Sequence, residues 1–425
     1  MFNFQHATVD RALKLGKSAL FANTGLGKGF QELAWAEAVC QYTDSPVLLV
    51  APLAVSKQFK REAQKIGLSV NICESQVDVT SGINITNYEK LHKFEARSFS
   101  GIVCDESSLL KGNGKLARSV IDFASVIDYR LAATATPSPN DYQEFGMQAE
   151  FLGVMTQQQM LATFFTHDGG NTSVWRLKKW GEDKFWQWVS SWATVYRMPS
   201  DIGYSDDGFV LPPLIDHHHA IESTLTPEDG ALFVSVASMS DRRRARRESL
   251  ADRINHAAEL INSDRDSWLV WCELNDEADE LLKLVPDAKQ VAGSQSPEEK
   301  ERILNEFSDG DLRVLVSKPS ICGSGMNWQH CRNVLFVGIN DSYESLYQAT
   351  NRVYRFGQKR EVHRHLVFSE HEWVVFDNLQ RKAQQADRMW SEVGKYFSTV
   401  LRPTDRHFID YKPSQKLEIP SWLLK

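Results

Sequence analysis

A segment near the beginning of the chain, residues 22–28 with the sequence ANTGLGK, has the residue types needed to hold a phosphate group. It follows the apolar run SALF and precedes the helical pattern QELAWAEAV. Glycines let the backbone wrap around a phosphate, the helix N-terminus supplies amide groups and its dipole, and Lys28 can reach the β and γ oxygens. We therefore expect a nucleotide to be held by Thr24, Gly25, Leu26, Gly27, Lys28 and Gly29.

The residue that follows the lysine departs from the usual pattern of such loops. Serine or threonine is expected there, because its hydroxyl group is a ligand of Mg²⁺, but this chain has Gly29. A glycine early in a helix costs up to about 1 kcal/mol relative to alanine, so it brings no evident structural gain. Water or the Thr24 hydroxyl could replace the missing ligand. We expect nucleotide to bind and its hydrolysis to be impaired.

Two adjacent carboxylates follow the apolar run GIVC at residues 101–104. A carboxylate at a strand end can hold the water shell of Mg²⁺, and its neighbour can polarise an attacking water. We assign Asp105 to the metal and Glu106 to the general base. The alternative is a helix N-cap followed by an acidic first turn. Thr134 and Thr136 end a further strand, where they either sense the γ-phosphate or form a plain strand exit before proline.

Residues 348–358, QATNRVYRFGQ, form the strongest single element. Arg352 and Arg355 are three residues apart, so on a helix they project from one face. Two guanidinium groups can clamp a γ-phosphate bound to another lobe, as arginine fingers do. The alternative, a basic helix on the surface, explains neither the flanking Gln348 nor the Gly-Gln ending. We include Gln348 in the catalytic set.

Two further segments give weaker signals. The glycine-rich turn GSGMNWQ at residues 323–329 could bring its amides, and Gly325 in particular, to a phosphate, although such turns are most often only tight loops. Near the start of the chain, Phe4 could stack on an adenine and Gln5 could hydrogen-bond to it. The alternative for both is the ordinary packing of a chain end.

The elements that must position these residues are predicted from an alternation of apolar runs and helical patterns. Over residues 1–150 the expected strands are SALFANTG, VLLVAPLA, GINITNYE, GIVCDESS and YRLAATATP. Over residues 216–380 they are SWLVWCEL, AKQVAG, RVLVSKPS, NVLFVGI and VHRHLVF. This rhythm predicts an α/β fold with two parallel sheets flanked by helices. Each candidate motif of the first half lies where a strand ends, the edge at which such sheets bind ligands.

Four segments are expected. Residues 1–150 form a first lobe, residues 151–215 a mainly helical, tryptophan-rich insertion and linker, residues 216–380 a second lobe, and residues 381–425 a tail that starts helical. Five of the twelve tryptophans fall between Trp175 and Trp192, with lysines between them. They either pack in a helical subdomain or form a surface that stacks on nucleic-acid bases. The basic run at residues 242–247 is likewise either a solvated helix face or a phosphate-contacting patch.

The composition is that of an ordinary globular protein of 425 residues with a net charge of −7. This charge argues only weakly against a nucleic-acid binder, because a local basic groove can lie on an acidic body. No apolar run is long enough for a membrane span, and the N-terminal residues lack the apolar stretch of a signal peptide. The six cysteines are scattered without metal-ligand spacing, which fits a reducing cytosol.

Together these motifs resemble those of the superfamily-2 helicases, specifically the Swi/Snf-type branch. GLGK is similar to motif I, DESS to motif II and TATP to motif III, while APLAVSKQFKREAQK and ITNYEKL resemble motifs Ia and Ib. GSGMNWQ resembles motif V, and QATNRVYRFGQ resembles motif VI with the RxGQ ending that marks this branch. The resemblance covers roughly residues 1–375. The region between AEFLGVM and WRLKKW looks like that of compact versions encoded by bacteriophages and prophages.

The resemblance implies two RecA-like lobes with ATP and Mg²⁺ in the cleft between them, and movement along duplex DNA. It implies that Gly25, Gly27 and Lys28 bind phosphates. It also implies that Asp105 and Glu106 serve Mg²⁺ and hydrolysis, that Arg352 and Arg355 are the fingers, and that Gln5 reads the adenine.

Three functions remain open on this sequence. The first is an ATP-dependent DNA translocase of the Swi/Snf type, acting in viral or bacterial DNA metabolism in the cytosol. The second is a nucleotide-responsive scaffold for DNA or protein, in which Gly29 has disabled hydrolysis. The third, a small-molecule phosphotransferase, explains the phosphate loop and the carboxylates but gives no role to residues 348–358 or to the second lobe.

Overall fold

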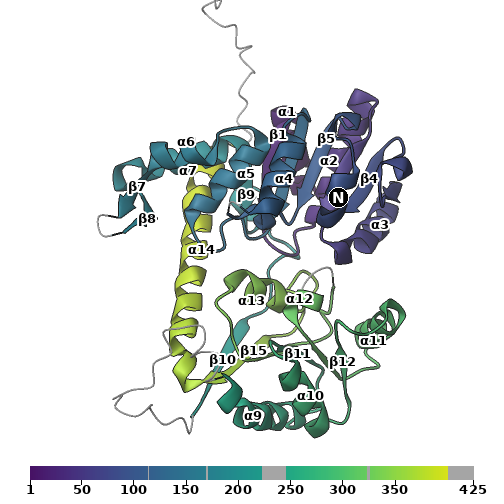
Figure 1. Ribbon diagram of the computed structural model, residues 1–425, viewed down its shortest axis with the longest axis vertical. Helices are drawn as coiled ribbons and strands as arrows, with labels where there is room; N and C mark the ends of the chain where they lie inside the picture. Colours follow the sequence, from purple (N-terminus) through teal and green to yellow (C-terminus); the bar gives the residue numbers. More distant parts are fainter. Residues whose placement is uncertain (113, 169–170, 223–245, 323–325, 401–425) are drawn as a thin grey trace, which may run out of the picture.

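The computed structural model describes residues 1–112, 114–168, 171–222, 246–322 and 326–400. Two α/β lobes lie one above the other in Figure 1, and a long helix runs along one side of both. This arrangement confirms the predicted fold class of two parallel sheets flanked by helices.

Lobe 1 is built on a seven-stranded sheet with the strand order β3-β4-β2-β5-β6-β1-β9. Every pair of neighbouring strands is parallel. The strands are β1 (Lys17–Ala22), β2 (Val47–Ala51), β3 (Val70–Ile72), β4 (Ile83–Asn87), β5 (Gly101–Asp105), β6 (Tyr129–Thr134) and β9 (Ala193–Tyr196). The helices are α1 (Asn3–Leu15), α2 (Lys28–Thr43), α3 (Ser56–Lys65), α4 (Lys115–Ala124) and α5 (Phe145–Leu152).

The order of the central strands explains why separate motifs meet. β5, β6 and β1 are neighbours in the sheet and run parallel, so their carboxyl ends lie at one edge. These ends carry Asp105, Thr134 and the loop that leads into α2. β2 and β5 are buried along their whole length, which is the pattern of strands covered on both faces by helices.

Lobe 2 is built on a six-stranded parallel sheet with the order β10-β15-β14-β11-β13-β12. The strands are β10 (Leu214–Ile221), β11 (Trp268–Cys272), β12 (Ala288–Val291), β13 (Val314–Ser317), β14 (Asn333–Val337) and β15 (Val362–Ser369). The helices are α9 (Leu250–Asn262), α10 (Asn275–Leu284), α11 (Pro297–Asp309), α12 (Pro319–Cys322), α13 (Tyr343–Thr350) and α14 (Trp373–Val400). Alternate residues of β11 enter different cores, because Leu269 and Trp271 face one side of the sheet and Val270 faces the other.

The segment between the lobes was expected to be mainly helical. It contains the helices α6 (Gln157–Phe164) and α7 (Glu182–Trp192), and also strands that were not predicted. β7 (Phe165–Asp168) and β8 (Asn171–Leu177) form an antiparallel hairpin, which projects from lobe 1 in Figure 1. β9 pairs with β1 and so belongs to the sheet of lobe 1. Trp186 and Trp192 pack in the core of that lobe, as the packing alternative predicted, whereas Trp180 is 81% exposed.

α14 connects the two lobes. Its first turns place Val375, Phe376 and Leu379 in the core of lobe 2, and its later turns place Met389 and Val393 in the core of lobe 1. The division that the sequence suggested at residue 380 therefore falls inside one continuous helix. Three polar contacts support its far end, namely Tyr142 with the carbonyl of Gln385, Arg388 with Glu182, and Arg197 with Asp387.

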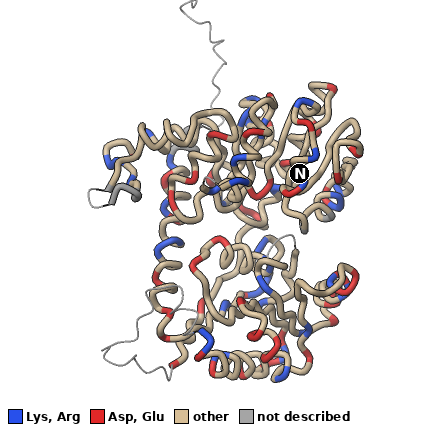
Figure 2. Tube along the Cα trace, in the orientation of Figure 1, with Lys and Arg blue, Asp and Glu red and all other residues tan. Residues whose placement is uncertain are grey.

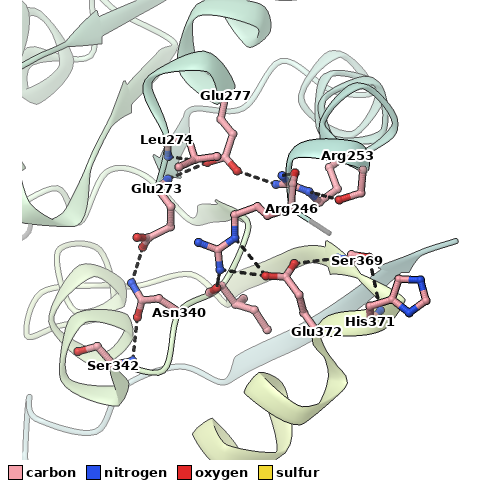
Figure 3. Close-up of polar contacts among 12 residues, drawn as sticks. Arg246, Arg253, Glu273, Leu274, Glu277, Asn340, Ser342, Ser369, His371 and Glu372 are labelled. Atoms are coloured by element: carbon pink, nitrogen blue, oxygen red, sulfur yellow. Dashed lines mark hydrogen bonds and ion pairs between the residues drawn. The ribbon is translucent and has the colours of Figure 1, made fainter. Parts of the chain in front are cut away.

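Ion pairs hold the base of α14 to the rest of lobe 2 (Figure 3). Arg253 and Glu277 form a fully buried pair at 2.8 Å, and the carbonyl of Arg246 accepts a hydrogen bond from Arg253. Arg246 in turn pairs with the buried Glu372 at 2.9 Å. Both interpretations of the basic run are therefore wrong for Arg246, because its guanidinium group is turned into the lobe. Residues 242–245 of that run lie outside the described residues.

A row of histidines joins the edge strand β10 to its neighbours. His217 contacts His363 at 3.0 Å and His219 contacts His365 at 3.1 Å, while His256 of α9 lies 3.0 Å from the other ring nitrogen of His219. The rings of His217 and His365 are stacked, with 4.4 Å between their centroids. Beside this row, which we call the histidine ladder, Arg364 and Asp216 form an ion pair at 2.6 Å.

All six cysteines are free and buried. Cys40, Cys73 and Cys104 lie in lobe 1, and Cys272, Cys322 and Cys331 lie in lobe 2. Within the described parts of the chain, no helix is both long and apolar enough to cross a membrane.

Candidate nucleotide site between the lobes

The predicted phosphate loop, which we continue to call the phosphate loop, lies between the end of β1 and the start of α2, where the sequence placed it. Gly25 and Gly27 have φ angles of +88° and +72°, which side chains rarely tolerate. A Cβ atom at Gly25 would lie 2.8 Å from the backbone nitrogen of Phe356, so this glycine also permits close approach of lobe 2. The Nζ atom of Lys28 lies 3.1 Å from the carbonyl oxygen of Ala22. Leu26 is buried, and its side chain is part of the lobe 1 core.

Gln5 lies against the phosphate loop. Its Nε2 atom donates to the carbonyl of Leu26 at 2.9 Å, and its Oε1 atom accepts from the backbone amide of Phe2 at 2.9 Å. It lines an apolar pocket whose other residues are Met1, Phe2, Gly25, Gly27, Phe30, Lys65, Ile66, Phe209 and Phe356. Phe4 is absent from this lining and packs in the core against Tyr196 and Phe209, so its interpretation as a stacking partner for adenine is wrong. The aromatic residues of this lining are Phe2, Phe30, Phe209 and Phe356.

The two carboxylates differ in their surroundings. Asp105 is 6% exposed, and burial followed by the charge of Glu106 raises its pKa well above the ordinary value. Glu106 has a left-handed backbone, with φ at 51°, and lines the pocket between the lobes. The Oε2 atom of Glu106 accepts hydrogen bonds from Thr134 at 3.3 Å and from Gln348 of lobe 2 at 3.5 Å.

The two arginines come from the segment after α13 and face the loop from lobe 2. Arg352 donates through Nε to the carbonyl of Gln348 at 2.9 Å, and both arginines donate to the carbonyl of Met326. Burial, assisted by the neighbouring Arg352, lowers the pKa of Arg355 to about 9. The Nε atom of Arg355 is buried without a partner among the described residues. An anion in the cleft would satisfy it.

One pocket brings together most of the residues singled out from the sequence. Its lining consists of Thr24, Gly25, Gly27, Lys28, Gly29, Val55, Gln58, Phe59, Glu62, Asp105, Glu106, Ala135, Gln348, Arg352 and Arg355. Gln5 and Leu26 lie beside it, in the apolar pocket and in the core respectively. Gly325 lies outside the described residues, although the carbonyl of its neighbour Met326 contacts both arginines.

Side chains of the two lobes also contact each other around this pocket. Tyr347 of α13 donates to Asn23 and lies 3.5 Å from the Thr24 hydroxyl. Glu344 accepts from Thr136 at 3.4 Å and pairs with Lys111. The end of β6 is therefore linked to Glu106 through Thr134 and to lobe 2 through Thr136.

Among the charged and phenolic side chains in and around the site, sequence reasoning did not single out Glu32, Glu62, Glu344 or Tyr347. Glu32 follows Lys28 by four positions in α2, so helical periodicity could have placed both on one face. Burial, followed by the charge of Asp105, raises the pKa of Glu32 well above the ordinary value. Glu62 lies within APLAVSKQFKREAQK, where the surrounding charges make it look like part of a solvated helix.

The pocket suits a nucleotide accompanied by Mg²⁺. A polyanion would find Lys28 on one side and two buried guanidinium groups on the other. No group of three or more His, Cys, Asp or Glu side chains in the described structure is arranged to hold a metal by itself. That absence is compatible with Mg²⁺, which is usually bound through one or two carboxylates, phosphate oxygens and waters.

Comparisons with known proteins agree with this architecture. Residues 252–357 match the family described as "Helicase conserved C-terminal domain". A curated protein of Acyrthosiphon pisum secondary endosymbiont phage 1, "Putative protein p41", is 23% identical over 87% of this chain and 91% of its own length.

Among solved structures, the ATP-dependent Type ISP restriction-modification enzyme LlaBIII bound to DNA matches with a TM-score of 0.57 and 13% identity. That match covers 90% of this chain but only 29% of the enzyme, so this chain spans less than a third of its length. The SWI2/SNF2 ATPase core of Sulfolobus solfataricus in complex with dsDNA gives a TM-score of 0.42 at 19% identity over 94% of both chains, too low to support a comparison of folds. The chain thus contains a region similar to the helicase C-terminal domain, within lobe 2, and its two-lobed fold is similar to that of LlaBIII.

Proposed function

We propose that this protein is an ATP-dependent motor that moves along duplex DNA. The observation that carries the proposal is that the phosphate loop of lobe 1 and the two arginines of lobe 2 line a single pocket. A triphosphate held there touches both lobes, so its binding favours their closure and its cleavage removes one of the groups that hold them together.

Each residue then has a defined task. The amides around Gly25 and Gly27 and the ammonium group of Lys28 bind the phosphates, and Asp105 orients the hydrated cation. Glu106, held by Thr134 and Gln348, accepts a proton from the attacking water. Bound Mg²⁺ would neutralise charge on the β and γ oxygens. The adenine is assigned to the apolar pocket that contains Gln5.

The two arginines make turnover depend on lobe closure. Arg352 and Arg355 are positioned by the carbonyls of Gln348 and Met326, all within lobe 2. Their distance from the phosphate loop is therefore set by how the lobes sit relative to each other. Cycles of closing and opening, with alternating grip on a phosphate backbone, would convert hydrolysis into steps along DNA.

The DNA is assigned to a second groove between the lobes. It is lined by Pro52, Leu53, Tyr88, Glu89, Glu106, Ser108, Leu109 and Leu116 of lobe 1 and by Pro319, Ser320, Ser342, Glu344, Ser345 and Gln348 of lobe 2. Its first residues belong to the segments that resemble motifs Ia and Ib. Figure 2 shows basic and acidic residues interspersed over both lobes, and the charged residues of the groove lining are all glutamates, so contacts to the DNA backbone would come from hydroxyl groups such as those of Ser108, Ser320 and Ser345 and from backbone amides. The structurally similar LlaBIII was solved bound to DNA.

The similarity to a phage protein supports a role in phage or bacterial DNA metabolism, in the cytosol of the bacterial host.

A second candidate function is a nucleotide-responsive scaffold that binds ATP but does not hydrolyse it, and the observation that favours it is Gly29. A phosphotransferase acting on small molecules ranks last, because it gives lobe 2 and its arginines no role.

Steady-state ATPase measurements with and without duplex DNA separate these candidates. We expect Mg²⁺-dependent turnover that DNA stimulates at least severalfold, because DNA in the groove favours the closed lobes. Nucleotide binding without turnover at saturating DNA would identify the scaffold instead. Turnover that ignores DNA but requires a small-molecule acceptor would identify a phosphotransferase.

A further inference from the structure

We propose that Glu62 supplies the metal-ligand oxygen that Gly29 lacks. The divalent-cation site would then use a carboxylate from α3 in place of a hydroxyl group from the first turn of α2. This inference rests on the proposed function, because the cation is expected to bind together with the nucleotide.

The first argument is the position of the Glu62 carboxylate. A Cβ atom built on Gly29 would overlap Oε2 of Glu62 and lie 3.2 Å from its carboxyl carbon. An oxygen atom therefore occupies the place from which a serine or threonine side chain would begin. This contact explains why residue 29 is a glycine, because any side chain at this position would displace the Glu62 carboxylate.

The second argument is that Glu62 is held in this orientation. Gln58, one turn earlier in α3, donates from Nε2 to Oε1 of Glu62 at 2.7 Å, which leaves Oε2 facing Gly29. Both Gln58 and Glu62 line the nucleotide pocket together with Lys28 and Asp105. Metal ligands are commonly oriented by neighbouring residues that do not touch the metal. A hydrogen bond to one carboxylate oxygen leaves the other oxygen directed at the metal site.

The third argument comes independently from Glu32. This side chain is fully buried, and neither of its carboxylate oxygens has a hydrogen-bond partner among the described residues. Such a group is costly as an anion, which is why burial raises its pKa, and a cation nearby would favour the charged form. Glu32 lies one helical turn after Lys28, on the face of α2 that looks toward β5, and Asp105 is close enough to interact with its charge.

The balance of charges in the cleft leads to the same conclusion. Four carboxylates (Glu32, Glu62, Asp105 and Glu106) lie near three cationic side chains (Lys28, Arg352 and Arg355). Burial raises the pKa of Glu32, Glu62 and Asp105, and a divalent cation bound beside them together with a triphosphate would favour their charged forms. Mg²⁺ bound by phosphate oxygens, water and one direct carboxylate meets this need.

The experiment measures cation affinity directly, in the complex with ADP, so that turnover is not required. Binding of Mn²⁺ is followed by electron paramagnetic resonance, and binding of fluorescent ADP is followed with Mg²⁺ and with excess chelator. The variants are Glu62→Gln, Glu62→Ala, Gly29→Thr and the double variant Gly29→Thr/Glu62→Ala. Glu37→Gln is the matched control, because Glu37 of α2 is also held by a glutamine one turn away. Thermal unfolding verifies that each variant is folded.

We expect both Glu62 variants to weaken Mn²⁺ binding in the ADP complex at least about tenfold, with ADP affinity in chelator unchanged. The double variant should recover most of the affinity, because the introduced threonine side chain then has room to supply a hydroxyl group. The Glu37 control should behave as the unaltered protein.

Unchanged Mn²⁺ affinity in Glu62→Gln and Glu62→Ala would overturn the inference and leave Glu62 as a charge partner of Arg355. A double variant that stays as weak as Glu62→Ala would also count against it. Failure of the unaltered protein to bind ADP under any condition is a different result, since it would reject the proposed function itself.

Discussion

Arg355 combines a buried guanidinium group, an Nε atom without a partner in the described structure, and a position facing the phosphate loop. Its pKa is lowered to about 9, mainly by burial, so it remains charged at neutral pH. A charged group held in this way loses little freedom when a phosphate arrives. Its contribution should therefore appear in the chemical step more than in nucleotide affinity.

We predict that Arg355→Ala lowers ATP turnover by about a thousandfold or more and changes the dissociation constant of ATP only modestly. Turnover is measured at saturating ATP and DNA, and affinity by titration with a fluorescent nucleotide. Arg360→Ala is the control, because Arg360 lies five residues later with 47% of its side chain exposed and outside the pocket. Wild-type turnover in Arg355→Ala would show that the two lobes do not form a shared site.

Several site residues were accessible to sequence reasoning because each follows a strand or lies in a short motif of fixed order. Lys28, Asp105 and the arginine pair are of this kind, and the structure brings them into one pocket. Glu62 could not be predicted in this way. Its proposed role depends on the packing of α3 against α2, which brings it next to Gly29. The sequence shows that residue 29 is a glycine and has no hydroxyl group. The oxygen proposed to replace that group belongs to Glu62, 33 positions further along the chain.

At the scale of elements, the ten strands with long apolar runs were predicted and are present. β9 was missed because four residues after a helix give little periodicity, and its burial comes from pairing with β1. β10 was missed because DHHHAI reads as polar sequence. Its stability comes from β15 and from imidazole contacts that no propensity scale includes.

The histidine ladder predicts that lobe 2 is destabilised by acid. Burial, followed by the charges of neighbouring histidines, lowers the pKa of His219 to about 4 and that of His365 to about 3. The unfolded chain binds these protons near pH 6.5, whereas the folded lobe does not. The contribution to stability is therefore complete above about pH 6.5 and decreases as the pH falls toward 4.

Thermal unfolding of the protein at pH 7.5 and at pH 5 checks this prediction. We expect the Tm of lobe 2 to fall by about 5 °C or more, and by less in His219→Gln, which removes one of the two strongly shifted groups. His6→Gln, in lobe 1, serves as the control for the loss of a histidine outside the ladder. If the Tm of His219→Gln fell with pH as much as that of the unaltered protein, the histidine ladder would not be the cause of the acid destabilisation.

α14 packs in the cores of both lobes. Disrupting the contacts of its C-terminal turns should therefore destabilise lobe 1 and leave lobe 2 unchanged. Val393 is fully buried in the lobe 1 core, and Val393→Asp places an unpaired charge there, at a cost of roughly 3 kcal/mol or more. We expect faster hydrogen exchange in α7 and β9, which α14 covers, with the sheet of lobe 2 unaffected. Ser391→Asp, at an exposed position two residues earlier, should change little. Unaltered exchange in α7 after Val393→Asp would mean that the contact does not stabilise lobe 1.

At the scale of the whole molecule, the lobes meet in few but specific places. Glu344 contacts both Thr136 and Lys111, Tyr347 contacts the phosphate loop, and Gly25 lies against Phe356. Beside them, Phe2 of lobe 1 and Phe209 of the linker pack against Phe356 of lobe 2, so polar pairs and an aromatic cluster both join the lobes. α14 adds a second apolar connection along one side of both lobes. The sequence predicted two lobes with a site between them, but not which side chains of the two lobes contact each other.

The distribution of thiols has a practical consequence. Three cysteines are enclosed in each lobe, and none is exposed in the folded protein. A reagent that alkylates only solvent-accessible sulfur would leave the native molecule unmodified, and peptide mapping would report which half had opened under stress. The chain thus carries built-in markers that distinguish the unfolding of one half from the other, without any engineered label.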